Sequence, residues 1–225
     1  MAGPPVGMVR VVPDVPQAFA DLVVAESPRT LVLSGGGTAE AAYRALAAAD
    51  GLHWPAVTVL FGDERFVPVD DPASNEGMAR RALLDHVEPA AVHSLATAAA
   101  DLDGAASAYS ALVAGLAPLD LVHLGLGEDG HTASLFPGSP ALDEHLALVV
   151  ATGDDQHPHP RLTLTYPGIA TAQLAVVTVA GAEKAEAWAR LCAGEDLPAS
   201  HLGPGRVVWL VDPAAAARTP DLLAT

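Results

Sequence analysis

The chain has 225 residues, of which 51% are apolar, and it carries a formal net charge of −16. The apolar content excludes general disorder, and the length predicts one domain spanning residues 1–225. The acidic balance argues against nucleic acid and anionic membranes as partners, because both bind basic surfaces. The single cysteine, Cys192, excludes a disulfide within the chain.

Short β-branched apolar runs alternate along the chain with alanine-rich helical runs. This alternation predicts an α/β fold whose mainly parallel, Rossmann-like sheet is covered by helices on both faces. Sheets of this kind bind ligands outside the C-terminal ends of their strands. In chain order, we expect strands at 31–33, 56–61, 119–124, 161–165, 174–179 and 207–211, and helices at 39–49, 74–86, 101–115 and 181–193.

No secretory signal is evident at the N-terminus, and the longest uncharged stretch, 162–182, contains a proline and several threonines. This stretch is therefore not typical of a membrane-spanning helix. We expect a cytoplasmic protein.

The first expected strand leads into a glycine-rich loop, Ser34-Gly35-Gly36-Gly37-Thr38. Three glycines let backbone N–H groups approach a ligand closely, and the dipole of the following helix favours an anion. No Gly-Lys-Ser/Thr follows, so this is not a nucleotide P-loop. The alternative is a tight strand-to-helix turn that needs glycine for its geometry alone.

A second loop begins Gly62-Asp63-Glu64-Arg65, with Ser74-Asn75 downstream. Two carboxylates and an arginine at a strand end can handle protons and an anion together. The same triplet is also common on solvated surfaces. Ser74 is expected to cap the helix that follows it.

The third loop, 125–132, matches the dinucleotide pattern G-x-G-x-x-G, but prolines soon interrupt any helix after it, so that reading is rejected. Its more informative feature is Asp129-Gly130-His131. An aspartate two residues from a histidine can orient the imidazole for general base catalysis. The alternative is a structural histidine that caps a turn.

Two histidines, His157 and His159, follow Asp154 and Asp155, but their spacing matches no usual zinc pattern. Prolines at positions 158 and 160 favour an extended, exposed segment, and 154–160 is the expected mobile loop. We therefore predict no metal site.

At the three loops the chain resembles 6-phosphogluconolactonases. The segments LSGGGT, GDERFVP with a following SN, and GLGEDGHTASLFPG look like signature segments of that family, in the same order. RLTLTYPGI and VAGAEK resemble two further blocks, so the resemblance covers roughly residues 9–212. One departure is HPHP before Arg161, where the family usually has a run of prolines.

The resemblance implies a fold similar to glucosamine-6-phosphate deaminase and hydrolysis of 6-phospho-D-glucono-1,5-lactone in the oxidative pentose phosphate pathway, without a metal or organic cofactor. His131 would be the general base, Asp129 would orient it, and Arg65 would stabilise the oxyanion or clamp the substrate. Asp63 and Asn75 could bond sugar hydroxyls. The residues implied in substrate and phosphate binding are Ser34, Gly35, Gly36, Gly37, Thr38, Asp63, Asn75, Arg161 and Lys184.

Lys184 is the only lysine among eleven basic residues, which favours a site that requires a compact ammonium. A chance position, or pairing with Glu183 or Glu186, is the alternative. The partner implied is a phosphorylated sugar lactone, bound by a monomer or weak homo-oligomer.

Two other functions compete with lactone hydrolysis. A glucosamine-6-phosphate deaminase usually carries a glutamate in a Phe-Asn-Glu-Pro segment, where this chain has Ser134-Leu135-Phe136-Pro137. A non-catalytic sugar-phosphate sensor would add a DNA-binding segment, and no basic recognition helix is evident here.

Overall fold

The computed structural model describes residues 5–95, 101–152, 159–203 and 205–219. A seven-stranded sheet in the order β1-β10-β9-β6-β2-β3-β5 runs through its centre, and every strand pair in it is parallel. Its strands are β1 (Met8–Val11), β2 (Thr30–Leu33), β3 (Thr58–Phe61), β5 (Ala91–Val92), β6 (Leu119–Gly125), β9 (Ala172–Val179) and β10 (Arg206–Val211).

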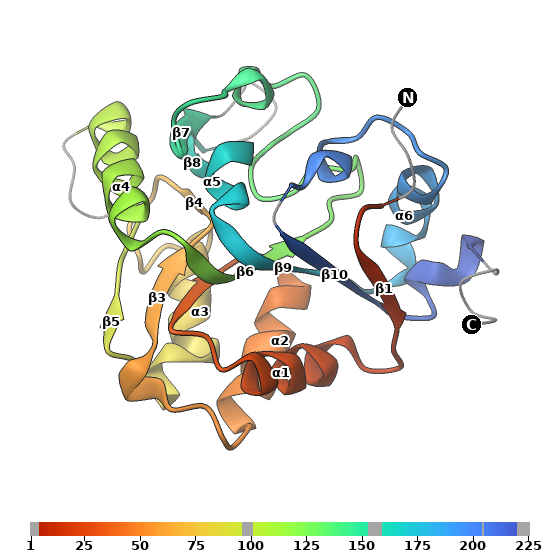
Figure 1. Ribbon diagram of the computed structural model, residues 1–225, viewed down its shortest axis with the longest axis horizontal. Helices are drawn as coiled ribbons and strands as arrows, with labels where there is room; N and C mark the ends of the chain where they lie inside the picture. Colours follow the sequence, from red (N-terminus) through yellow and green to blue (C-terminus); the bar gives the residue numbers. More distant parts are fainter. Residues whose placement is uncertain (1–4, 96–100, 153–158, 204, 220–225) are drawn as a thin grey trace.

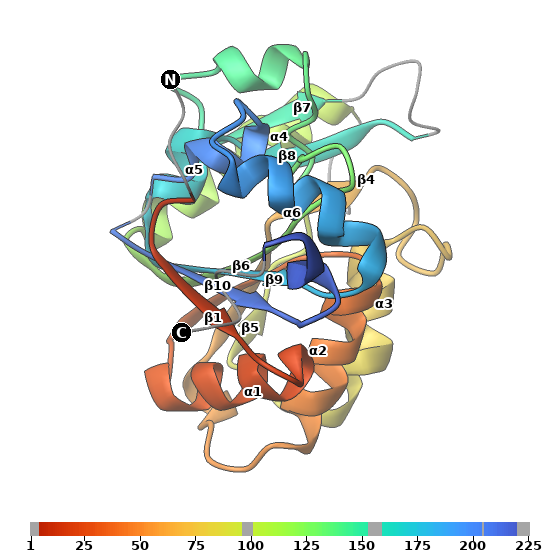
Figure 2. The same cartoon turned by 90° about the vertical axis from the view of Figure 1, so that its right-hand side faces the viewer.

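Helices cover both faces of this sheet, as the alternation of elements predicts (Figures 1 and 2). In Figure 2, α1, α2 and α3 lie below the sheet, and α4, α5 and α6 lie above it. The helices are α1 (Val15–Glu26), α2 (Gly37–Ala48), α3 (Asn75–Ala82), α4 (Leu102–Leu116), α5 (Tyr166–Ala170) and α6 (Ala185–Cys192). Short 3₁₀ turns are η1 (Trp54–Ala56), η2 (Leu84–His86), η3 (Pro140–Asp143), η4 (Ala182–Lys184), η5 (Pro198–His201) and η6 (Ala215–Arg218).

The central strands are continuously apolar because both of their faces are buried. All but the first residue of β2 and β3 are buried, and β9 has one exposed residue, at its second position. Strand β9 lies between β6 and β10, with Leu174 beside Leu121 on one side and Arg206 on the other. This pairing brings the ends of β6 and β9 to the same edge of the sheet.

The strand expected at 161–165 is present as β8 (Arg161–Leu164), but it does not belong to the parallel sheet. It forms the middle of a separate antiparallel sheet with β4 (Asp63–Arg65) and β7 (Val149–Thr152). Sequence periodicity cannot distinguish the two, because an apolar four-residue strand reads alike in either sheet. Buried residues from both sheets form one hydrophobic cluster.

One expected helix differs in its bounds, and two elements at the N-terminal end were not expected. The helix expected at 74–86 ends at Ala82 and continues as the 3₁₀ turn η2, while Ser74 caps it as expected, its hydroxyl accepting the N–H of Gly77 at 2.9 Å. Sequence periodicity missed β1 and α1 at the N-terminal end. The side chain of Asp14 caps α1 by accepting the backbone N–H of Gln17. The sequence did contain a signal for this helix, because an aspartate before an apolar run is a common helix start.

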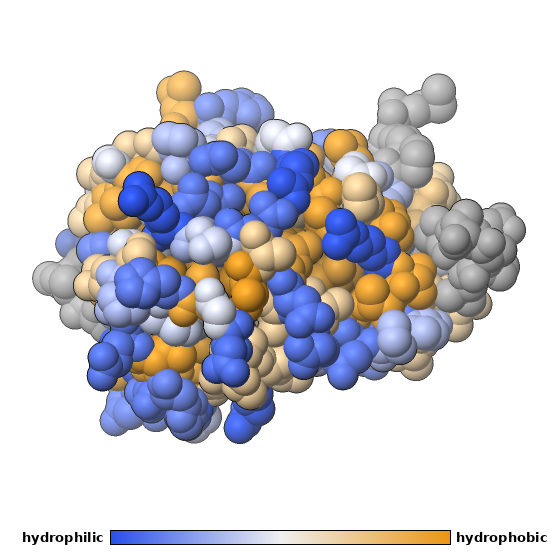
Figure 3. Space-filling model, turned by 60° about the horizontal axis from the view of Figure 1, so that its bottom comes forward, coloured by the Kyte–Doolittle hydropathy of each residue, from blue (hydrophilic) through white to orange (hydrophobic). Residues whose placement is uncertain are grey.

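Figure 3 shows the face that lies at the bottom of Figure 1, where hydrophilic and hydrophobic residues are interspersed. Within the described ranges, no helix is long and apolar enough to cross a membrane.

Candidate active site

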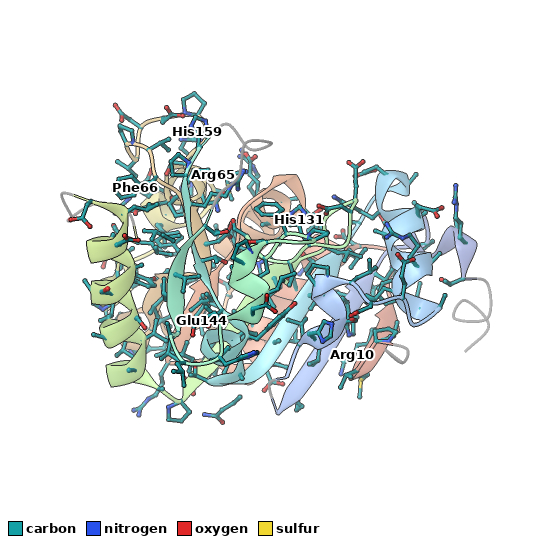
Figure 4. The ribbon with its side chains drawn as sticks, turned by 90° about the horizontal axis from the view of Figure 1, so that it is seen from above. Arg10, Arg65, Phe66, His131, Glu144 and His159 are labelled. Carbon is teal, nitrogen blue, oxygen red and sulfur yellow. The ribbon has the colours of Figure 1, made fainter. Side chains whose placement is uncertain are left out.

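A cavity of about 790 Å³ lies at the C-terminal ends of β2, β6 and β9. This is the edge at which parallel sheets bind ligands. Figure 4 shows Arg65 and His131 on one side of the molecule and Arg10 on the other. All twelve residues singled out in the sequence line the cavity: Ser34, Gly35, Gly36, Gly37, Thr38, Asp63, Arg65, Asn75, Asp129, His131, Arg161 and Lys184.

The glycine loop delivers the N-terminus of α2 to this cavity. Gly36 is the N-cap residue, and its φ of 93° lies in the region that favours glycine. Among the described residues, no side chain caps the helix, and a Cβ at Gly36 or Gly37 would meet nothing within 4 Å. Gly36, Gly37 and Thr38 all line the cavity, so the first backbone N–H groups of α2 lie beside it and can donate to an anion bound there.

The third loop holds a hydrogen-bonded histidine–aspartate pair. Asp129 Oδ1 lies 2.6 Å from His131 Nδ1 and also accepts the backbone N–H of His131 at 3.1 Å. Gly127 allows this arrangement, because a Cβ there would lie 2.0 Å from Nδ1. Partial burial alone would raise the pKa of Asp129, but the hydrogen bonds and the imidazole of His131 outweigh burial and lower that pKa below its usual value. Asp129 is therefore ionised at neutral pH.

The second loop forms a network around Arg65. Its Nη1 donates to Asn75 Oδ1 at 2.7 Å and to the carbonyl of Ala73 at 2.9 Å. Asn75 Nδ2 donates to the backbone carbonyl of Asp63, while Asp63 Oδ2 accepts the hydroxyl of Ser134 at 2.7 Å. Within the described part of the chain, the buried Nε of Arg65 has no hydrogen-bond partner, and Nη2 forms no hydrogen bond either, so the Nη2 donors remain for a ligand in the cavity.

Glu64, which the sequence offered only as one of two carboxylates that could handle protons, holds this loop in place instead. Its carboxylate is buried and accepts the backbone N–H groups of Asn75 and Glu76 at 2.7 Å and the hydroxyl of Ser74 at 3.0 Å. Burial raises the pKa of Glu64, and these hydrogen bonds oppose the rise. The carboxylate joins β4 to the N-terminus of α3 and thereby fixes the position of Arg65.

Phe136 is a second residue that the sequence left without a role. Its ring centroid lies 4.7 Å from that of His131, and Arg161 Cζ lies 5.3 Å from the same centroid. A cation over an aromatic face is attracted by the ring quadrupole. The ring of Phe136 therefore packs against both the imidazole of His131 and the guanidinium of Arg161. Arg161 also pairs with Arg65 across β4 and β8, which brings two cations to the cavity.

Lys184 ends the 3₁₀ turn η4 and lines the cavity. Glu186, one of its two possible partners, pairs with Arg218 instead. In the described part of the chain, no carboxylate forms an ion pair with Lys184. Its ammonium is therefore available to an anionic ligand.

Of the histidine-rich segment 154–160, the structure describes only His159 and Pro160. Asp154, Asp155 and His157 lie outside the described residues. Among the residues that are described, no group of three or more metal-binding side chains is assembled. Cys192 is half-buried, and burial raises the pKa of its thiol to about 11, so the thiol is not activated as a nucleophile.

The fold and the cavity together define an α/β protein with a small-molecule site, built from a histidine–aspartate pair and several cationic groups at the ends of parallel strands. A family model described as glucosamine-6-phosphate isomerases/6-phosphogluconolactonase matches residues 8–209. The chain belongs to this family.

A 6-phosphogluconolactonase from Synechocystis is 43% identical over 201 residues, which cover 83% of this chain and 82% of the relative. The solved structure of a 6-phosphogluconolactonase from Trypanosoma cruzi has a TM-score of 0.82 at 28% identity and covers 96% of this chain and 97% of its own. A monomeric glucosamine-6-phosphate deaminase shares the fold, with a TM-score of 0.82 at 24% identity, covering 94% of this chain and 99% of its own. The family resemblance and the fold class inferred from the sequence are thus confirmed.

Proposed function

We propose that the chain hydrolyses 6-phospho-D-glucono-1,5-lactone to 6-phospho-D-gluconate in the oxidative pentose phosphate pathway. The observation that carries this proposal is the Asp129–His131 pair in a cavity that also holds cationic groups and a free helix N-terminus. The name of the Synechocystis relative supports the same reaction. Asp129 bonds Nδ1 of the imidazole, so that nitrogen carries the hydrogen and Nε2 keeps the lone pair of a base.

In the proposed reaction, His131 Nε2 takes a proton from water as the water oxygen attacks the lactone carbonyl carbon. The carbonyl oxygen becomes an oxyanion, which Arg65 stabilises through the donors that Asn75 and Ala73 leave free. When the carbonyl re-forms, the bond from carbon to the ring oxygen breaks, and the imidazolium returns its proton to that oxygen. The ionised Asp129 stabilises the imidazolium in between.

We assign the substrate phosphate to the glycine loop, Lys184 and Arg161. The N–H groups at the start of α2 and the ammonium of Lys184, which has no ion-pair partner among the described residues, both favour an anion. The register of β4 and β8 places Arg65 beside Arg161, so both guanidinium groups line the cavity and can contact one anionic ligand. Neither proton transfer nor phosphate binding at these groups requires a metal or an organic cofactor.

Asp63 and Asn75 are already hydrogen-bonded within the protein, so we propose that their main role is to position neighbouring side chains. Both side chains line the cavity, yet Asn75 Oδ1 already accepts from Arg65 and Asp63 Oδ2 from Ser134. We propose that Asn75 chiefly positions Arg65, and contact of either residue with the sugar stays a prediction. We further propose a single domain over 1–225 acting in the cytoplasm, as a monomer or weak homo-oligomer.

The test uses freshly prepared 6-phosphogluconolactone, with product identified by NMR against spontaneous opening. The wild type should accelerate opening, and His131→Ala should lose ~10²–10⁴-fold in rate while keeping its fold. His201→Ala is a matched control, because His201 forms a similar pair with Asp196 (2.5 Å) outside the cavity. Ammonia release from glucosamine 6-phosphate at a comparable rate, or near-normal turnover by His131→Ala, would overturn the proposal.

A further inference from the structure

A buried chain of hydrogen bonds crosses the sheet beneath the cavity. The Tyr43 hydroxyl, on α2, accepts the backbone N–H of Ser34 at 2.5 Å and lies 2.9 Å from His123 Nδ1. His123, on β6, lies 2.9 Å through Nε2 from the hydroxyl of Thr178 on β9. Tyr43 and His123 are fully buried, and Thr178 is 3% exposed. The two ends of the chain, Ser34 and Thr178, both line the cavity.

The hydrogens of this chain can be arranged in two ways, because a neutral imidazole carries one N–H. If the hydrogen is on Nε2, the imidazole donates to Thr178, accepts the Tyr43 hydrogen at Nδ1, and leaves the Thr178 hydrogen free. If it is on Nδ1, Thr178 must donate to Nε2 and presents only lone pairs elsewhere.

The distances favour the first arrangement. The Tyr43 hydroxyl oxygen lies 2.9 Å from His123 Nδ1 but 3.2 Å from its other acceptor, the carbonyl of Ser34. We assign the phenol hydrogen to Nδ1, because the other arrangement places it on the longer contact to Ser34, and the imidazole hydrogen then lies on Nε2. Burial lowers the pKa of His123 to about 3, so the ring is neutral and carries only that hydrogen.

Thr178 lies where its free hydrogen can meet an anion. The cavity that it lines is also lined by Gly37, which begins α2, and by Lys184. We propose that Thr178 is a further binding residue, which donates its hydroxyl hydrogen to the phosphate group of the ligand, and that His123 is the positioning residue that fixes this donor. This inference rests on the proposed function, of which it names an additional phosphate contact.

A purely structural role accounts poorly for these side chains. Burying an imidazole and two hydroxyls among apolar residues costs free energy that apolar side chains of similar size do not. Phe19 packs against His123 at 4.1 Å between ring centroids, and Leu210 lies beside Thr178 on the neighbouring strand β10, so the surroundings suit apolar residues. A chain of polar groups whose ends both line one cavity is explained by ligand binding.

The test measures binding of inorganic phosphate and of 6-phosphogluconate by titration calorimetry. Thr178→Val should weaken both by about tenfold or more, because a hydrogen bond to a charged group is lost, and Thr178→Ser should restore most of the affinity. Thr58→Val is the matched control, since Thr58 is a half-buried strand threonine that does not line the cavity. Unchanged binding in Thr178→Val overturns the inference, and so does weaker binding of 6-phosphogluconate alone.

Two further measurements separate positioning from folding. His123→Leu should raise KM for the phosphorylated lactone by about threefold or more with kcat little changed, because Thr178 remains but is no longer oriented. In phosphate-saturated wild type, the nitrogen chemical shifts of His123, identified by their loss in His123→Leu, should report hydrogen on Nε2. Hydrogen on Nδ1, or a loss confined to kcat, contradicts the inference. If the wild type binds phosphate through Thr178 but does not open the lactone, the proposed function fails and this inference stands.

Discussion

The buried imidazole of His123 should make the stability of the folded protein depend on pH in a way that one substitution removes. Its pKa is lowered by burial to about 3, whereas an unfolded histidine has a pKa of ~6.5. Below that value the unfolded chain gains a proton on His123 and the folded chain does not. Stability from this group is therefore complete at neutral pH and is lost as the pH falls toward the folded pKa.

The size of the effect follows from the two pKa values. Between about pH 7 and about pH 5, protonation of His123 in the unfolded chain alone lowers the free energy of unfolding by about 2 kcal/mol. His123→Leu deletes this contribution. The variant is expected to be less stable than the wild type at pH 7, since Tyr43 and Thr178 lose a partner, and its deficit should shrink by about 2 kcal/mol at about pH 5.

Urea unfolding at the two pH values, followed by tryptophan fluorescence, measures both quantities. Trp188 and Trp209 are buried against each other, 5.6 Å apart between ring centroids, and provide the signal. His53→Leu is the control, because it removes an imidazole from an exposed position. If His123→Leu and wild type lose the same free energy between the two pH values, His123 does not stay neutral in the folded state and the argument is refuted.

Three other substitutions test the site. Lys184→Met should raise KM for the phosphorylated lactone by about tenfold and leave unphosphorylated gluconolactone nearly unaffected, as steady-state kinetics on both substrates will measure; equal losses on the two would exclude a phosphate role. Phe136→Leu should lower kcat/KM about two- to fivefold without unfolding the protein, since Arg161 and His131 lose their shared ring, and unaltered kinetics would show that the ring supports neither. Glu64→Gln should lower the free energy of unfolding in urea by about 1–3 kcal/mol, because an amide NH₂ would face groups that donate to the carboxylate. An unchanged unfolding midpoint would show that Glu64 does not hold its loop in place.

The edge of the sheet that holds the cavity could be predicted from the sequence, because the order of strands, loops and helices is encoded locally along the chain. Apolar strands followed by glycine-rich loops and helices force parallel connections, and parallel connections bring successive strand ends to one edge. The glycine loop and Asp129-Gly130-His131 therefore line one cavity although about ninety residues separate them. The hydrogen bond of Asp129 to His131 was likewise local, since only one residue lies between the two.

Tertiary structure alone decided the contacts between residues far apart in the chain. Whether β8 joined the parallel sheet depended on its pairing with β4, nearly a hundred residues earlier. The buried chain from Tyr43 to His123 and Thr178 spans separations of 80 and 55 residues, and each residue alone reads as an isolated polar side chain in an apolar element. Periodicity reports which face of an element is buried but not which groups meet there. A buried hydrogen bond needs two partners at a fixed distance, and only packing of the sheet and its helices sets that distance.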